Sequence, residues 1–442
     1  MDRPPPSPIS RILSVLIGGS EQFRRNFLHL ASANALAQLI GVLALPLLTR
    51  LFSPQDFGIL AVYTATQSVL LAVVTGRFEW AVPSARHPSE AARLIGLGLV
   101  ATGLTTAIVG VAIAWDGAAI AARLGLSETH RNLLWLLPLG VLAGGIQLLL
   151  ESWHVFQAVM TPVSRAKLLQ SVGTILASVI AGALSAGALG LVAGYVLGFV
   201  LAGPVLARGQ GQLFLRLKHL HLASLGAAFG LHWRDTAASL ALSIVNVAMA
   251  MSMTFLLTTY YDATTVGWYG LVFRAATAPI GLFTTAIVHS FWADAATLAK
   301  SDPAKLRRFF LQSVGRLAIF SLPVAAVCLA GPWYIGPIFG ATQWSGAGVL
   351  LAAVTPYLVG IIIFGPTTHM IVYGRQHWQL GCDLLTLIIA SALFGLAARL
   401  GYAAWVAVLA ASVALFCGYL LRFALHLRAN TLHARIPAPP TA

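Results

Sequence analysis

Residues 168–207 read LLQSVGTILASVIAGALSAGALGLVAGYVLGFVLAGPVLA and contain no charged side chain. As a single α-helix this stretch would be about 60 Å long, twice the roughly 30 Å apolar thickness of a bilayer. The chain must therefore turn back within it, near Gly187–Gly190. Gly190, Gly194 and Gly198 recur at every fourth position, a pattern typical of closely packed membrane helices. The stretch predicts two antiparallel spans.

The composition of the whole chain extends this prediction. Of the 442 residues, 58% are hydrophobic and 9% are charged, and the mean hydropathy is +0.84. Soluble domains are about one quarter charged, so a soluble globular protein is excluded. Apolar runs of spanning length recur throughout and predict an all-α polytopic membrane protein. The twelve predicted spans are Phe27–Leu48, Phe57–Val74, Arg93–Trp115, Leu133–Phe156, Leu168–Gly187, Leu189–Leu206, Thr236–Leu257, Gly267–His289, Phe310–Leu329, Ala347–Met370, Leu380–Ala398 and Ala403–Leu421.

The basic residues are distributed unevenly between the two sides of the predicted membrane. The net charge is +14. With the N-terminus inside, the inside segments hold 22 of the 27 Lys and Arg and 9 of the 13 Asp and Glu, whereas the outside segments hold 4 of each. This asymmetry predicts that both termini lie in the cytoplasm. Since the basic surplus sets orientation, nucleic acid is not expected as a partner.

A weak internal repeat divides the chain in two. LTRLFS at residues 48–53, followed by Gly58, returns 209 residues later as LTTYYD at residues 257–262, followed by Gly267. An even number of spans in each half gives both halves the same orientation. We therefore predict two six-helix lobes related by a pseudo-two-fold axis along the membrane normal. The predicted parts are a cytoplasmic N-terminal segment (1–26), an N-lobe with spans one to six (27–206), a cytoplasmic amphipathic connector (207–235), a C-lobe with spans seven to twelve (236–421) and a cytoplasmic tail (422–442).

Motifs for enzymatic chemistry are missing from the sequence. No phosphate loop, HExxH or GxSxG motif occurs, so we expect no enzyme activity, no cofactor and no metal. The cysteines Cys328, Cys382 and Cys417 lie in apolar runs without ligand spacing. His219 and His221 in the connector fit a basic amphipathic segment on the inner membrane surface better than a metal site. Two six-helix halves of this kind are common in membrane transporters. Because the sequence has no nucleotide-binding motif, transport would be driven by an ion gradient, the substrate gradient or a partner protein.

Arg274 is the clearest candidate for a functional residue. It lies seven residues into the predicted eighth span, the only charge that we place deep within a span. A guanidinium group stays charged and binds two phosphate oxygens at once. Facing a central cavity, it would attract an anionic headgroup. The alternatives are a structural ion pair or a snorkelling position near the outer interface.

Arg77 and Glu79 end the second predicted span at its inner side, next to Trp80. They are candidates for an entry site for an anionic substrate, or for a gating pair that breaks on opening. The alternative is a pair of ordinary interfacial charges.

Two further sets of polar residues lie within the predicted spans. Candidates for proton coupling, near the inner ends of the fourth and eighth spans, are Glu151, His154 and His289. Candidates for the wall of a polar cavity are Asn34 and Gln38 on one face of the first span and Asn246 in the seventh. Satisfied interfacial groups and hydrogen bonds between helices remain the alternatives for these sets.

Three segments together resemble bacterial oligosaccharide flippases. Residues 48–61, LTRLFSPQDFGILA, are similar to the first-loop signature of that family. Arg77–Glu79 resembles its Arg-Tyr-Glu at the end of span two. Val266–Tyr269, with Arg274 and Pro279, resembles its eighth span. The resemblance extends over nearly the whole chain.

This resemblance implies membership of the polysaccharide biosynthesis protein family, within the multidrug/oligosaccharidyl-lipid/polysaccharide exporter superfamily. It implies two lobes in a V, with Arg274 in a cationic cavity between them and Arg77 at the inner mouth. The implied substrate is a polyprenyl-diphosphate-linked oligosaccharide, moved to the periplasmic leaflet for O-antigen, capsule or exopolysaccharide. Phe78 replaces the usual Tyr, and the first-lobe helices carry few charges, so the sequence identifies no second cavity cation.

The leading hypothesis is a flippase that works by alternating access. Membrane lipids, a glycan polymerase and a chain-length regulator are candidate partners. A multidrug or cation antiporter of the same fold would use acidic cavity residues, whereas the only deep charge here is basic. A glycan polymerase or ligase would have a large outer loop, and the longest predicted here is only residues 116–132.

Overall fold

The computed structural model describes residues 21–281, 303–340, 342–365 and 376–433. Within these ranges the chain is helical and contains no strand. The helices are α2 (Glu21–Leu51), α3 (Pro54–Val73), α4 (Pro88–Arg123), α5 (Leu136–Phe156), α6 (Thr161–Ala183), α7 (Gly187–Ala207), α8 (Gly211–Lys218), α9 (Leu222–Tyr260), a helix over 263–281, α11 (Pro303–Leu329), α12 (Gly331–Phe339), α13 (Ser345–Phe364), α14 (Gln376–Arg399) and α15 (Ala404–His433), with the 3-10 turns η1 (Phe78–Trp80), η2 (Val82–Ser84) and η3 (Glu128–Trp135).

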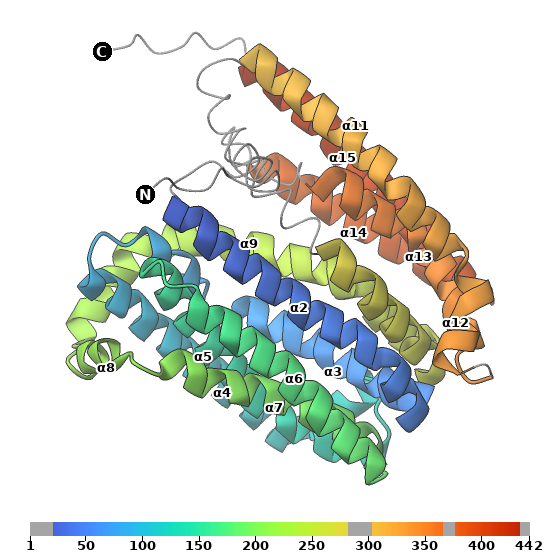
Figure 1. Ribbon diagram of the computed structural model, residues 1–442, viewed down its shortest axis with the longest axis horizontal. Helices are drawn as coiled ribbons and strands as arrows, with labels where there is room; N and C mark the ends of the chain where they lie inside the picture. The colour runs from blue at the N-terminus through green and yellow to red at the C-terminus, as the bar shows by residue number, and fades with distance from the viewer. Residues whose placement is uncertain (1–20, 282–302, 341, 366–375, 434–442) are drawn as a thin grey trace, which may run out of the picture.

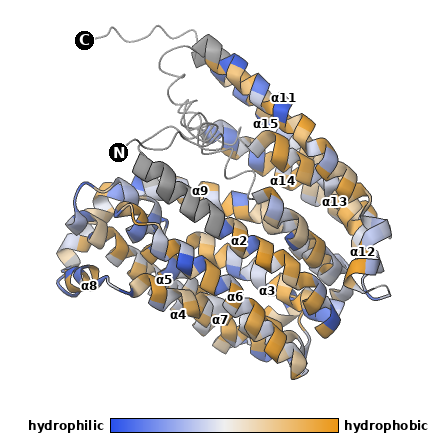
Figure 2. Ribbon diagram, in the orientation of Figure 1, coloured by the Kyte–Doolittle hydropathy of each residue, from blue (hydrophilic) through white to orange (hydrophobic). Residues whose placement is uncertain are grey.

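Eleven of the described helical segments are long and apolar enough to cross a membrane. They coincide with predicted spans one to seven and nine to twelve. The predicted eighth span, Gly267–His289, begins within the helix over 263–281, and its second part lies outside the described residues. The chain is therefore a multi-pass membrane protein with a predominantly helical fold. Figure 2 shows apolar residues along the helices of both ends of the bundle, and large apolar side chains such as Leu104, Ile108 and Leu184 are exposed, where lipid would cover them.

The turn predicted inside residues 168–207 is confirmed. α6 ends at Ala183 and α7 begins at Gly187, and both Ser185 and Gly187 have a positive φ of 56°. Gly194 and Gly198 of α7 pack closely against α6. A Cβ at either position would meet polar side chains of that helix. These contacts fix the rotation of α6 and hence which of its residues face away from α7.

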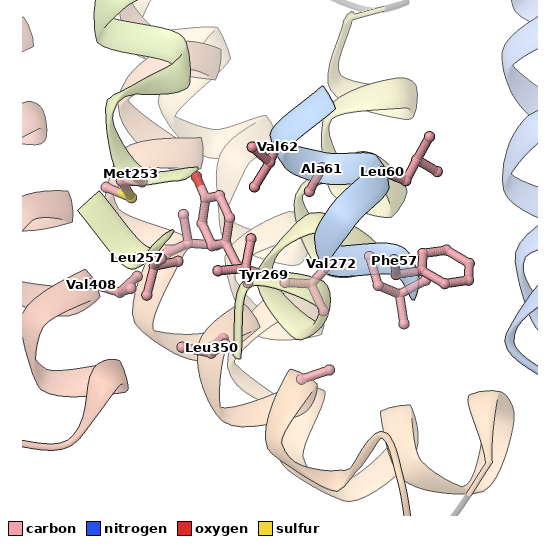
Figure 3. Close-up of a cluster of buried hydrophobic side chains, with 14 of the residues drawn as sticks. Phe57, Leu60, Ala61, Val62, Met253, Leu257, Tyr269, Val272, Leu350 and Val408 are labelled. Atoms are coloured by element: carbon pink, nitrogen blue, oxygen red, sulfur yellow. The ribbon is translucent and has the colours of Figure 1, made fainter. Parts of the chain in front are cut away.

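Figure 1 shows two groups of helices that lie together at the end occupied by α12 and diverge toward the chain termini. The first group comprises α2 to α7, and the second comprises α11 to α15. Between them lie α9, which packs against α3, α4 and α14, and the helix over 263–281. At the end occupied by α12, here called the closed end, one buried apolar cluster extends through both groups. There Tyr269 and Val272 meet Phe57 and Val62 of α3 (Figure 3).

The connector region differs from the prediction in its local structure. α8 is a short basic amphipathic helix, with Leu213 buried and Leu215 exposed. α9 then begins at Leu222 and continues without interruption through the predicted seventh span to Tyr260. No proline lies within Leu222–Tyr260 to remove a backbone hydrogen bond, so the helix of the seventh span can extend back through the predicted connector.

The two glycines of the internal repeat contact each other's helices at the closed end. A Cβ on Gly58 would overlap the carbonyl oxygen of Ala263, and a Cβ on Gly267 would overlap the carbonyl oxygen of Pro54. Pro54 and Ala263 are themselves separated by the repeat offset of 209 residues. The contact is therefore reciprocal, as expected when related segments meet at a two-fold axis. Only glycine permits so close an approach of two backbones.

Candidate functional site

A cavity of about 360 Å³ with both apolar and polar lining residues lies beside Arg274. Its walls come from α2, α3, α6, α7 and the helix over 263–281. The polar lining residues are Asn34, Gln38, Lys167, Gln170, Ser171, Thr174, Ser178, Tyr195 and Arg274. Amides and hydroxyls make up most of these polar groups, and the two charges in the lining are both positive. The cavity is therefore suited to a polar ligand with negative charge.

Arg274 lies on the boundary between two cavities. It also lines a second space of about 190 Å³, together with Thr64 and Ser68 of α3 and Thr254 of α9. Its helix begins at residue 263, so Arg274 lies about 16 Å along the helix axis, deeper than the sequence predicts. The phenol of Tyr195 is near enough to interact with it electrostatically. No carboxylate in the described ranges forms an ion pair with it.

Lys167 is a second cavity cation that the sequence analysis missed. Its Nζ lies 2.8 and 3.1 Å from the two carboxylate oxygens of Glu151 on α5. Gln147 Nε2 donates to Glu151 Oε1 at 2.8 Å and to Gln170 Oε1 at 2.9 Å, which extends the network to the cavity wall. The predicted fifth span begins at Leu168 and so leaves Lys167 in an inside segment, whereas α6 begins at Thr161 and Lys167 lies in its second turn. Pro162 in the first turn is the helix-start signal that could have revealed this.

The predicted polar pair on α2 lies in the wall of the larger cavity. Asn34 and Gln38 both line the larger cavity. Gln38 Oε1 is buried without a hydrogen-bond partner among the described residues, so it remains available to a ligand. Ser171 donates to the carbonyl oxygen of Ala37 at 2.8 Å and joins α6 to α2. Asn246, in contrast, is exposed on α9 and lines neither cavity.

Arg77 and Glu79 form an ion pair outside both cavities. Arg77 Nη1 lies 3.4 Å from Glu79 Oε1, and its guanidinium carbon lies 4.7 Å from the centre of the Trp80 ring. Burial lowers the pKa of Arg77, and the charge of Glu79 opposes that shift. The hydroxyl of Thr75 donates to Glu79. Arg77 has a φ of +64°, a left-handed conformation that costs an arginine about 1 kcal/mol or more and that these contacts stabilise.

The three predicted proton-coupling residues do not form one group. Glu151 is paired with Lys167, as described above. His154 is buried against α7, where its Nε2 lies 2.9 Å from the carbonyl oxygen of Leu206. His289 lies outside the described residues. The described parts of the chain therefore show no relay between Glu151 and His154.

A second ion pair within the helices corrects the expectation that the only deep charge is basic. Asp383 of α14 and Arg422 of α15 form a hydrogen-bonded pair that is almost completely buried, with Arg422 stacked over Tyr419. The predicted spans Leu380–Ala398 and Ala403–Leu421 place both charges at the inner ends of the spans, where charges are common. They could not be matched from sequence because 39 residues separate them. Each charge is tolerable there because the other neutralises it.

Comparison with known proteins connects this geometry to a family. A family model described as polysaccharide biosynthesis protein matches residues 47–348. The chain belongs to the polysaccharide biosynthesis protein family. Arg77, Glu79, Lys167 and Arg274 all fall within the matched range. A comparison with curated proteins finds no match for this family member.

Solved structures similar to this family member are membrane transporters. A multidrug resistance MATE family transporter of the MOP superfamily, in an inward-facing conformation, aligns with a TM-score of 0.73 at 13% identity, covering 97% of this chain and 99% of that one. The lipid II flippase MurJ, in an inward closed conformation, aligns with a TM-score of 0.70 at 12% identity, covering 92% and 89%. At these identities the similarity establishes a shared fold.

Proposed function

We propose that the protein is a flippase for polyprenyl-diphosphate-linked oligosaccharides in the bacterial inner membrane, serving O-antigen, capsule or exopolysaccharide synthesis. The observation that carries this proposal is Arg274, a cation without a carboxylate partner among the described residues, at a cavity between the first group of helices and the helix over 263–281. The diphosphate would bind Arg274, and the sugars would contact the amides and hydroxyls of the wall. No covalent step is involved, so the proposed protein is a transporter and not an enzyme.

The physical problem of flipping is the cost of an unpaired charge in the membrane, several kcal/mol or more by order of magnitude. Arg274 offsets much of that cost because a guanidinium binds phosphate oxygens bidentately. The apolar tail would stay in lipid while the headgroup crosses. Polyprenyl-linked glycans are therefore the substrate class that best fits a small cationic cavity inside a lipid-facing helical fold.

Two six-helix lobes and alternating access form part of this proposal. The reciprocal contact of Gly58 and Gly267 supports a pseudo-two-fold arrangement, and the groups diverge away from that contact (Figure 1). In the proposed transport cycle, the contact opens while the divergent ends close. Membership of the polysaccharide biosynthesis family and the fold shared with MurJ, a lipid II flippase, support the same mechanism.

A cation antiporter of the same fold is less well supported by the charges. Glu151, which contacts the lining residue Lys167, is neutralised by it, and Asp383 is neutralised by Arg422. Both charges in the cavity lining are positive, which would repel a cationic drug. A glycan polymerase or ligase is disfavoured because only residues 124–127 separate α4 from η3.

The proposal predicts the side on which the substrate accumulates. In cells lacking the gene, polyprenyl-diphosphate-linked oligosaccharide should accumulate in the inner leaflet and disappear from the outer leaflet. Leaflet-resolved analysis, with a membrane-impermeant glycosidase on spheroplasts and on inverted vesicles, would measure this. Restoring the gene should reverse the distribution. An unchanged distribution in the deletion strain would reject the flippase assignment.

The positive-inside distribution predicts that the C-terminus is cytoplasmic. A reporter active only in the periplasm, fused after Ala442, should therefore give no signal. The matched control carries the same reporter inserted at Gly125, in the loop that joins α4 to η3, and should be active. Activity at the C-terminus would overturn the proposed orientation.

A further inference from the structure

The two cavity cations differ in one respect. Lys167 already has an anionic partner, since both oxygens of Glu151 lie within 3.1 Å of its ammonium nitrogen. Arg274 forms no ion pair with a carboxylate in the described chain. The cavity therefore presents one open cation and one that is occupied by a side chain of the protein itself.

The Lys167–Glu151 pair is more exposed than the Arg422–Asp383 pair. The side chains of Lys167 and Glu151 are 33% and 16% exposed, whereas those of Arg422 and Asp383 are 4% and 3% exposed. A pair sealed between helices cannot separate without leaving a buried charge. A partly exposed pair contributes less to stability and exchanges its partner at lower cost. The long flexible stem of lysine also lets its ammonium group turn toward a ligand.

Few other groups hold the Glu151 carboxylate. Lys167 and Gln147 are its hydrogen-bond donors among the described residues. Gln147 also donates to Gln170, a residue of the cavity wall, so the carboxylate lies one amide away from the ligand space. Gln147 donates to Oε1, the same oxygen that lies 2.8 Å from Lys167. If the lysine ammonium turns away toward a ligand, the carboxylate therefore keeps its hydrogen bond with Gln147.

We propose that Glu151 is an internal counter-anion of the substrate site, which holds Lys167 until the phosphate groups of the substrate displace it. This inference rests on the proposed function and deepens it by naming how the site selects its ligand. Coulomb attraction to the lysine grows with the charge of the competing anion. A diphosphate has more negative charge than a monophosphate and displaces Glu151 more effectively. The site therefore favours diphosphate-linked lipids over monophosphate-linked ones.

Binding measurements on the full-length protein in lipid nanodiscs test this inference. The probes are farnesyl diphosphate and farnesyl monophosphate, titrated calorimetrically into wild type, Glu151→Gln, Lys167→Gln and the double variant. Glu151→Gln should tighten monophosphate binding by about tenfold, as expected when a competing ion pair is removed, and tighten diphosphate binding less. Lys167→Gln should weaken diphosphate binding, and Glu151→Gln should give no gain in that background. Glu151→Ala is a second variant in case the first is not recovered folded.

The outcomes separate this inference from the proposed function. If wild type binds the diphosphate and Glu151→Gln leaves both affinities unchanged, the counter-anion role is wrong and the proposed substrate class stands. A gain from Glu151→Gln that persists without Lys167 also refutes it, because the effect would then be a general change in charge. If wild type binds neither lipid, the proposed substrate class is wrong and this inference falls with it.

Discussion

Replacing Arg274 with alanine is expected to abolish surface glycan while the protein still inserts into the membrane in normal amounts. The guanidinium lies at both cavities and has no carboxylate partner in the described chain, so its loss removes ligand attraction without exposing a buried acid. In the proposed complex, Arg274 and the diphosphate of the substrate form a buried charge pair. Truncating one partner of such a pair costs about 2–5 kcal/mol, which corresponds to at least about a thirtyfold loss of affinity for the ligand. Glycan staining of whole cells, normalised to the amount of protein in the membrane, measures the effect.

Two controls separate the role of the charge from that of packing. Arg274→Lys keeps the charge and loses the bidentate geometry, so it should retain part of the activity. Arg77→Ala alters a cation that lies outside both cavities, and its effect on headgroup binding should be smaller. Near-normal glycan from a well-expressed Arg274→Ala protein would remove Arg274 from the site.

Replacing Gly267 with alanine is expected to destabilise the protein severely. The added methyl group would overlap the carbonyl oxygen of Pro54, and backbone cannot rotate aside as a side chain can. Extra methylene groups in packed cores cost about 1–3 kcal/mol, and a backbone obstacle places this change at the upper end or beyond. The repeat-related Gly58→Ala should behave similarly, since its methyl group would meet the carbonyl oxygen of Ala263. Thermal unfolding in detergent, followed by size-exclusion chromatography, measures the loss.

Gly110→Ala is the matched control for this experiment. Gly110 also lies inside a helix, α4, but a Cβ there would meet no atom within 4 Å. Alanine is the better helix former, so this variant should be as stable as wild type or slightly more so. Equal thermal stability of Gly267→Ala and Gly110→Ala would show that the contact between the two helices is not needed for the fold.

Several residues illustrate what could be read from the sequence. Arg274 was identified because a charge inside a long apolar run is unusual, whichever face of the helix carries it. Lys167 was missed because it lies near a span end, where a lysine is common and carries no signal. Its role depends on facing α2 and Glu151, and no local pattern reports that. Asn246 shows the opposite error, since similar depth in a span did not place it at the cavity.

The sequence by itself determined the class of the protein, eleven of its membrane-crossing helices and its family. These properties follow from local quantities, because the bilayer acts on each apolar run separately. The tertiary structure alone decided which polar residues share a cavity and which charges are neutralised. That outcome depends on how helices distant in the chain rotate against one another, as in the Trp344–Thr49 hydrogen bond across 295 residues. Close contacts such as Gly58 with Ala263 fix those rotations, and they arise only when the whole bundle packs.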